Sequence, residues 1–412
     1  MEDSELTYGG QGFSCWGFTT KIAGVFASPT LLRAAITIVY GVPLQCILDR
    51  TTRPRWHFSA VSIIMLFIQW GSFGTEMSMV LCVWKKTIPF ETLTLMVLLV
   101  LSGASTFTIF LLYFYNPTYI FVKRGESTIS PEFSFEPEGR HVTLAMTRKK
   151  WARVSGFLVL GAVGVAFMVF CDAENTFFDF YGIHGKKGDL DDLFNQNSNL
   201  CMNGKKFKYL YVTGVAGLFW GFLAAAVSCC VFYVACLDIV HHVGYIEELI
   251  LRRARDFRAA KSYHECLLKY TDNVIGTFKY WFFIHSVFFF LAILCSIAGW
   301  VAVVSKAIEN DSHIGSIILA EVAGSLVIAF KYAFPMYAAS QVTSRFDKMY
   351  RRVARECSPS TFPDVDVFMS YCFRCKGGFK VLGIRVTARL ALMALLSSFV
   401  GFGRVYQMIK GQ

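Results

Sequence analysis

Several ionisable side chains stand inside stretches of the sequence that are otherwise apolar. A charge exposed to hydrocarbon is costly unless it meets water, a cavity or a partner. Each such residue therefore predicts a place where a helix faces protein or water and not lipid. The candidates are Glu76, His285, Glu321, Lys331, Arg385, Arg389 and Arg404.

The residue patterns that catalysis or metal binding needs are missing. Cys372 and Cys375 form a lone Cys-x-x-Cys pair, with no second pair and no histidines at ligand spacing. Nothing resembles a glycine-rich phosphate loop, a paired-carboxylate site or a nucleophile with its base. We therefore expect no enzyme and no metal site. We likewise expect neither a cofactor nor a nucleic acid as a partner.

The composition points to a lipid bilayer as the main surroundings of the chain. Apolar residues make up 55% of the 412 residues, charged residues only 17%, and the mean hydropathy is +0.47. The apolar residues are gathered into blocks of about twenty or more, the length that a bilayer core demands. An open strand edge in hydrocarbon would leave its backbone N–H and C=O groups unpaired. The sequence therefore predicts an all-α membrane protein.

Seven apolar blocks are long enough to be spans. The stretch Ala34–Leu48 is shorter and is interrupted by Gly41-Val42-Pro43, so we expect it to be an interfacial helix. Residues 1–56 then form an N-terminal segment, and residues 57–412 form the seven-transmembrane domain. The predicted spans cover about 57–84, 90–115, 152–171, 209–237, 278–305, 313–339 and 380–408.

The distribution of lysine and arginine sets the orientation. The N-terminal segment and the loops on its side hold 26 of these residues, whereas the other side holds 9. The positive-inside rule places the richer side in the cytosol. Because seven is odd, the C-terminus is then extracellular.

Two features agree with this orientation. The sequon Asn310-Asp311-Ser312 falls in a turn on the outer side, which makes Asn310 a glycosylation candidate. Cys171 and Cys201 bracket the longest outer loop, where oxidation is permitted. They are a disulfide candidate, and two unpaired thiols remain the alternative.

The segments expected on the cytosolic side have apolar residues at helical spacing. Residues 243–275 contain Ile246 and Leu249 and no proline, which predicts long helices that project below the membrane. Phe346, Met349 and Val353 form a similar stripe. We expect these stripes to face water in a monomer and to join copies of the chain. A neighbouring basic face contacts either anionic lipid or protein, and comprises Arg345, Lys348, Arg351, Arg352 and Arg355.

The last span is unusually short. Its uninterrupted apolar part, Leu390–Phe402, is closed by Gly403-Arg404 and is too short to anchor a helix that faces lipid on all sides. Such a helix is reasonable if one face lines a conduction path. The alternative is a helix packed centrally among others through Gly401 and Gly403.

Two motifs carry a family resemblance. Ser28-Pro29-Thr30-Leu31-Leu32, followed by Tyr40-Gly41-Val42-Pro43-Leu44, is similar to the entry into a first span, and Phe379–Gly383 followed by an apolar helix and Gln407 is similar to a final span. With the seven-span layout, the chain resembles a divergent member of the insect gustatory and odorant receptor superfamily of ion channels. The family signature reads Thr-Tyr, five apolar residues, then Gln-Phe. Here only Gln407 matches it.

The resemblance implies a function as a chemoreceptor, a ligand-gated cation channel subunit of the gustatory-receptor-like kind in the plasma membrane. It implies a homo- or hetero-tetramer around a central pore lined by the last span. The implied pore-lining candidates are Ser397, Phe399, Val400, Arg404 and Gln407. A small-molecule ligand would bind among the outer halves of the spans, where the candidates are Tyr209, Tyr211, Trp220, Trp300 and Glu321.

Other multi-span proteins are the competing interpretations. A G-protein-coupled receptor has the opposite orientation, and this chain has neither an Asp/Glu-Arg-Tyr triplet at the end of the third span nor an Asn-Pro-x-x-Tyr motif in the seventh. A transporter is expected to show an internal repeat, and we find none. A transporter and a non-conducting membrane protein remain as alternatives.

Overall fold

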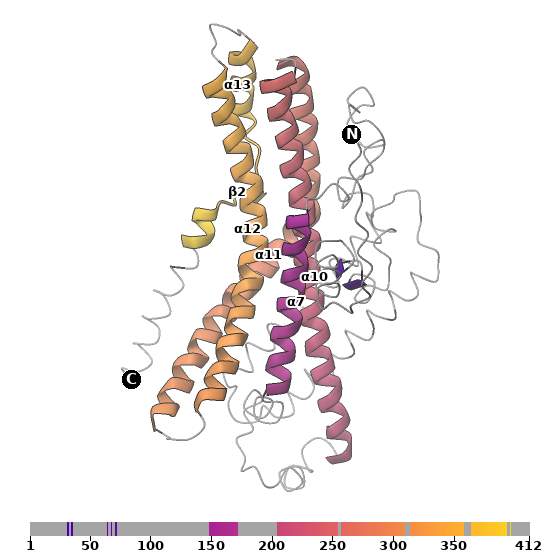
Figure 1. Cartoon of the computed structure of the whole chain (residues 1–412), viewed down its shortest axis with the longest axis vertical. Helices are drawn as coiled ribbons and strands as arrows, with labels where there is room; N and C mark the ends of the chain where they lie inside the picture. Colours follow the sequence, from indigo (N-terminus) through magenta and orange to yellow (C-terminus); the bar gives the residue numbers. More distant parts are fainter. Residues whose placement is uncertain are drawn as a thin grey trace, which may run out of the picture.

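The computed structural model consists of long helices that run side by side (Figure 1). It describes residues 148–171, 204–253, 257–309, 314–357, 364–393 and 396, with a few isolated positions between 31 and 71. The long helices are α7 (Arg148–Cys171), α10 (Gly204–Glu248), α11 (Phe257–Glu309) and α12 (Ile314–Glu356), and the short elements are the π-helical turn η2 (Leu249–Arg253), α13 (Asp364–Arg374), β1 (Lys380–Val381) and β2 (Ile384–Arg385).

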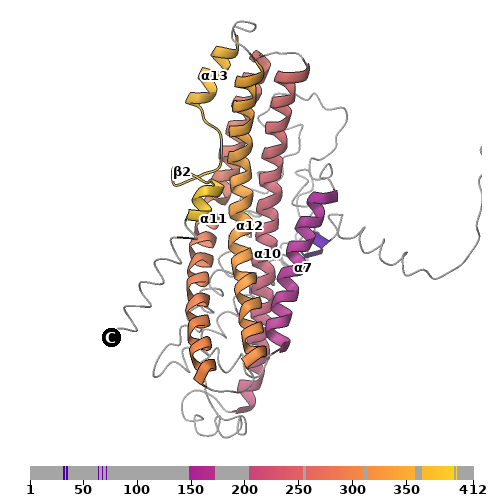
Figure 2. The ribbon, with the colours of Figure 1, turned by 60° about the vertical axis from the view of Figure 1, so that its left-hand side comes forward.

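Helices α10, α11 and α12 form an up-and-down bundle. Each of them contacts the other two, and α7 packs against α10 and α12. Figure 2 shows α7 at the edge of the bundle. Helix α13 lies against α11 and α12 at one end of the bundle, which we call the α13 end. At this end α10 leads through η2 toward the start of α11, and α12 ends.

The long helices cover four of the seven ranges predicted as spans. These ranges are 152–171, 209–237, 278–305 and 313–339, the last of them from Ile314 onward. All three bundle helices continue well past these ranges toward the α13 end, as the amphipathic spacing predicts. The predicted spans 57–84 and 90–115 lie almost wholly outside the described residues.

Within the described residues, one helix is long and apolar enough by itself to cross a membrane. It covers Leu223–Leu251, and 83% of its most apolar part is buried inside the protein. The pair Ala260–Gly276 and Phe278–Leu294, bent by 52°, reaches the same length and composition only together.

The last predicted span begins later than we expected. Residues 380–385 do not belong to a helix but form the antiparallel hairpin β1–β2, in which Lys380 pairs with Arg385. Leu382 and Gly383 make its turn with φ angles of 51° and 81°, in a left-handed region that no helix interior accepts. The helix starts at residue 388.

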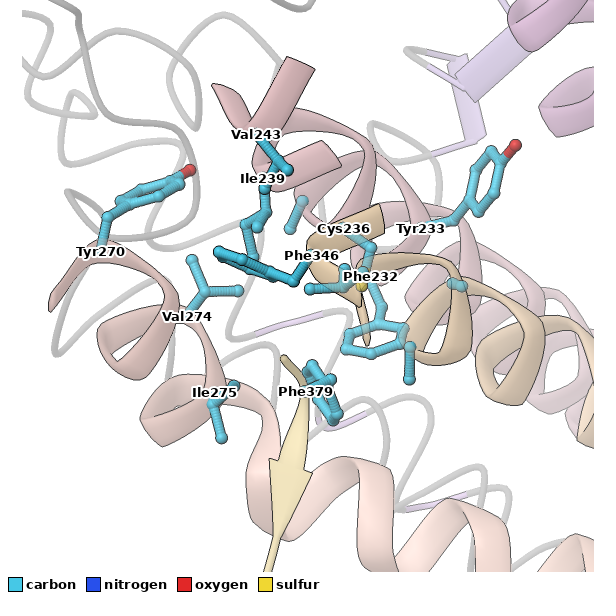
Figure 3. Packing of buried hydrophobic residues seen from close by; sticks show 14 of the residues in the cluster. Phe232, Tyr233, Cys236, Ile239, Val243, Tyr270, Val274, Ile275, Phe346 and Phe379 are labelled. Carbon is cyan, nitrogen blue, oxygen red and sulfur yellow. The ribbon is translucent and has the colours of Figure 1, made fainter. Parts of the chain in front are cut away.

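The apolar stripes near the α13 end are buried within one chain, which corrects the expectation that they face water in a monomer. Ile246, Phe346, Met349 and Val353 are 0% exposed, and Leu249 packs against the same core. This core lies between α10, α11 and α12, where Ile239, Val274 and Phe346 meet (Figure 3). The helical periodicity correctly identified which faces are apolar. These faces pack against one another within one chain and not against other copies of the chain.

Candidate functional site at the base of the last helix

A short segment, residues 376–386, connects α13 to the last helix and is fixed to the bundle by Phe379. The Phe379 side chain is fully buried. Its ring centroid lies 5.3 Å from that of Phe232 on α10 (Figure 3). It also lies 5.1 Å from that of Phe282 on α11. The segment that carries the last helix is therefore anchored in the core shared by the bundle helices. We call residues 376–386 and the side chains that hold them the junction.

Helix α12 holds the junction with three polar side chains. The Phe379 N–H donates to Thr343 Oγ1 at 3.1 Å, and the Gly377 N–H donates to the Tyr350 hydroxyl at 3.0 Å. Between them, Asp347 accepts from Arg385 Nη2 at 2.9 Å. Residues 343, 347 and 350 share one helix face, so this face of α12 holds the segment at the base of the last helix.

Glycines allow the junction to approach α12 closely. A Cβ at Gly377 would lie 2.5 Å from two ring carbons of Phe346, which is itself fully buried. Gly378 has a φ of 139°, which side chains rarely adopt. Arg385 closes the segment from the other side by donating to the Gly377 carbonyl at 2.7 Å. The sequence placed Arg385 within the last predicted span, but it belongs to the junction.

A buried histidine extends the junction to α11. Nε2 of His264 lies 2.9 Å from the Tyr350 hydroxyl, and Nδ1 lies 3.5 Å from the Tyr371 hydroxyl on α13. Because Tyr350 already accepts from the Gly377 N–H, its own proton is free to be donated to an unprotonated Nε2. Burial lowers the pKa of His264 to about 4, in agreement with a neutral ring. The hydrogen bonds thus run from the junction through α12 to α11 and α13.

The last helix starts with a cap. Thr387 Oγ1 accepts from the Leu390 N–H at 3.1 Å, as an N-cap residue does. The next apolar side chains lack cover from the described part of the chain. Leu390, Leu392, Met393 and Leu396 are 44%, 58%, 58% and 50% exposed.

A second group of polar side chains lies inside the bundle, within the ranges predicted as spans. His285 Nε2 lies 3.1 Å from the Lys331 carbonyl oxygen and 3.4 Å from Cys229 Sγ. Since the carbonyl can only accept, Nε2 carries the hydrogen. The rings of Trp281 and Phe289 flank His285 at 4.8 and 4.5 Å. The side chains of Lys331 and His285 are almost completely buried, which agrees with the expectation that they face protein.

The predicted ligand-binding residues lie on the three bundle helices. Tyr209, Tyr211 and Trp220 belong to α10, Trp300 to α11 and Glu321 to α12. Through the up-and-down topology, all five belong to the end of the bundle opposite α13. The pore candidates Ser397, Phe399, Val400, Arg404 and Gln407, and also Cys201 and Asn310, lie outside the described residues, whereas Cys171 ends α7.

The lone Cys-x-x-Cys pair lies on α13 and at its end. Cys372 is buried and Cys375 is exposed. Burial raises the pKa of Cys372 to about 12, so its thiol stays protonated near neutral pH and behaves as a small apolar group. Within the described ranges, no group of three or more potential metal ligands comes together.

The junction was missed by the sequence analysis. Tyr350, His264, Thr343 and Asp347 stand in ordinary helical stretches, and no local pattern distinguishes them. Phe379 was noted as part of the motif Phe379–Gly383, but not as an anchor. A hint was available in Gly377-Gly378, because adjacent glycines mark a turn or a close approach of the backbone.

The fold is similar to that of solved insect chemoreceptors. The insect olfactory receptor OR5 from Machilis hrabei matches with a TM-score of 0.62 at 11% identity, and the match covers 95% of this chain and 98% of that one. The same receptor in complex with eugenol matches with a TM-score of 0.62 over 100% of its length. No family model and no curated protein sequence matches this chain. The likeness thus lies in the fold.

Proposed function

We propose that this chain is a subunit of a ligand-gated cation channel of the insect chemoreceptor type. The observation that carries the proposal is the described start of the last helix, where the apolar side chains Leu390, Leu392, Met393 and Leu396 are exposed on several sides. In a channel whose last span lines a shared pore, these side chains would be covered by lipid and by other copies of the chain. The olfactory-receptor fold, together with the two sequence motifs, supports the same conclusion.

In this proposal the chain has seven spans, a cytosolic N-terminus and an extracellular C-terminus, and it resides in the plasma membrane. Four copies, identical or mixed, surround a pore lined by Ser397, Phe399, Val400, Arg404 and Gln407. The α13 end then lies in the cytosol. A tetramer is inferred from the superfamily that the sequence resembles.

A small molecule would open the channel from the opposite end of the bundle. The five candidates Tyr209, Tyr211, Trp220, Trp300 and Glu321 combine apolar surface with a few polar groups, as a ligand pocket needs. The structurally similar olfactory receptor OR5 from Machilis hrabei was solved in complex with eugenol, so a small aromatic molecule is a reasonable first probe. A ligand that moves α12 would move the last helix through Thr343, Asp347 and Tyr350. A gustatory-receptor-like role is part of the proposal, on the sequence motifs alone.

The direct experiment is a recording from planar bilayers that contain the purified protein. A panel of small apolar molecules, starting with eugenol, should evoke cation currents in discrete single-channel steps, and bilayers without protein should stay silent. A saturable flux without steps would favour the transporter alternative. No flux with any compound, from protein shown to be inserted, would favour a non-conducting membrane protein.

A further inference from the structure

A strongly basic cavity lies beside the core at the α13 end, between α10 and α12. Its volume is about 440 Å³, within the usual range of small-molecule sites. Every residue that lines it is charged. The lining consists of Arg345, Lys348, Arg351, Arg352 and Arg355, with the carboxylates of Glu247 and Glu356.

The helical spacing of α12 gathers the cations on one side. Lys348, Arg352 and Arg355 follow Arg345 by three, seven and ten residues, so they lie within about 80° of one another around the helix. With five cations and two carboxylates, the cavity has a formal charge of +3. The same helix buries its apolar stripe, Phe346, Met349 and Val353, in the core. The cationic side chains therefore remain close together outside that core.

A buried carboxylate fixes two of the guanidinium groups in place. The Glu247 side chain on α10 is only 6% exposed. Its Oε2 forms an ion pair with Arg345 Nη2 at 2.5 Å, and its Oε1 accepts a hydrogen bond from Arg352 Nη1 at 2.7 Å. Arg352 also reaches Glu356 through Nε at 2.7 Å. Gly244 leaves room for this arrangement, because a Cβ there would lie 3.3 Å from Arg345 Nη2. The two arginines are therefore held at the wall of the cavity before any ligand arrives.

The other three cations keep most of their hydrogen-bonding capacity. Among the described residues, Lys348, Arg351 and Arg355 form no ion pair with a carboxylate within 4.0 Å. Arg351 donates through Nε to the Asp347 carbonyl at 3.2 Å. Its terminal nitrogens are not used in that bond. Guanidinium groups with open N–H donors match the oxygens of phosphate groups.

We propose that this cavity binds a compact anion that carries several phosphate groups. Three cations without carboxylate partners call for more than one negative charge, and phosphate supplies two charges and several acceptors in one group. The lining offers no aromatic or aliphatic residue against which a base could stack. The chemistry therefore fits a phosphorylated polyol better than a nucleotide.

Such an anion exists both free in the cytosol and as a lipid headgroup. Arg345 and Arg355 lie six and sixteen residues beyond the end of the predicted span at 339, or about 9 and 24 Å along the helix. Most of the cavity would then lie deeper in the cytosol than the phosphates of the bilayer. This favours the free anion, and it is the one step that rests on the proposed topology.

The experiment measures binding to the purified full-length chain and needs no current. Inositol hexakisphosphate is titrated as the free probe, and vesicles of phosphatidylcholine with and without phosphatidylinositol bisphosphate are the lipid probe. The variant Lys348→Gln with Arg355→Gln removes two exposed cations from the cavity. The matched control, Lys269→Gln with Arg374→Gln, removes two exposed cations outside the cavity, on α11 and at the end of α13.

The free probe should bind saturably, and the cavity variant should weaken it by at least about tenfold while the control leaves it unchanged. Binding only to vesicles that contain the phosphorylated lipid would assign the headgroup as the source and refute the free anion. Binding of neither probe, or an equal loss in the control, would overturn the proposal.

Discussion

The Tyr350 hydroxyl lies 2.9 Å from Nε2 of His264 and 3.0 Å from the backbone nitrogen of Gly377. One oxygen atom on α12 thus connects α11 with the segment that carries the last helix. All three groups are buried, so none of them can exchange this partner for water without an opening of the bundle. This atom is the point at which the junction can be tested most simply.

Tyr350→Phe should lower the free energy of unfolding by about 1–3 kcal/mol, because it leaves the Gly377 N–H and His264 without their buried partner. The ring and its packing are kept. Tyr371→Phe is the matched control, since its contact with His264 is longer, at 3.5 Å. Thermal or denaturant unfolding in detergent measures both variants. An equal loss of unfolding free energy in Tyr350→Phe and Tyr371→Phe would contradict the conclusion that the Tyr350 hydroxyl connects α11 with the junction.

Acidification should destabilise the α13 end through His264. Burial lowers the pKa of His264 to about 4, whereas an imidazole in the unfolded chain takes up a proton below about pH 6.5. The unfolded chain therefore binds more protons between these values, and stability falls as the pH is lowered from about 6.5 to 4. The full effect is on the order of 3 kcal/mol.

The measurement is the unfolding midpoint of the natural chain and of His264→Gln between neutral pH and pH 4. Glutamine retains a donor and an acceptor but does not titrate. At neutral pH the His264→Gln variant should be less stable than the natural chain. Between neutral pH and pH 4 it should lose less stability than the natural chain does. Parallel pH profiles of the two proteins would show that His264 does not carry the effect.

Gly377→Ala should destabilise the junction by about 1–3 kcal/mol through overpacking, because its Cβ would collide with the buried Phe346 ring. Gly276→Ala on α11 is the control, since a Cβ there meets no described atom within 4 Å. Phe346→Leu alone should be destabilising, yet it should reduce the cost of the added methyl group. A double-mutant cycle of unfolding free energies measures this coupling. If the effects of Gly377→Ala and Phe346→Leu on the unfolding free energy were additive, the predicted collision between the added methyl group and the Phe346 ring would be wrong.

The orientation of the chain is tested with tags at both ends. The 26 to 9 distribution of basic residues predicts that in intact cells the C-terminal tag is accessible and the N-terminal tag is hidden. Asn310→Gln should also abolish a glycosidase-sensitive shift in electrophoretic mobility. A hidden C-terminal tag, with the N-terminal tag exposed, would contradict both the topology and the channel proposal.

The bundle could be predicted from the sequence because its signals are local. Apolar blocks and helical spacing identify α7, α10, α11 and α12, and even the faces that are buried. They do not reveal what covers a face, which is why Ile246 and Phe346 were expected to contact other copies of the chain. A spacing rule describes one helix, whereas burial depends on its neighbours.

The junction could not be predicted because its contacts join distant residues. His264 and Tyr350 are 86 positions apart, and Thr343 and Phe379 are 36 positions apart. The two strands of the hairpin have two residues each, too few to show an alternating pattern. Arg385 is an example, since the sequence placed it in the last predicted span without a partner, and its partner in the structure is Asp347 on α12.

The central claim is that the last helix lines an ion path, and Gln407 tests it most directly. A current through Gln407→Cys channels in a bilayer is recorded before and after an impermeant thiol reagent is added from the extracellular side. The account predicts that the current falls, and that Met408→Cys, about 100° further around the helix, responds less. An unchanged current through Gln407→Cys channels that are shown to be labelled would contradict pore lining by this helix.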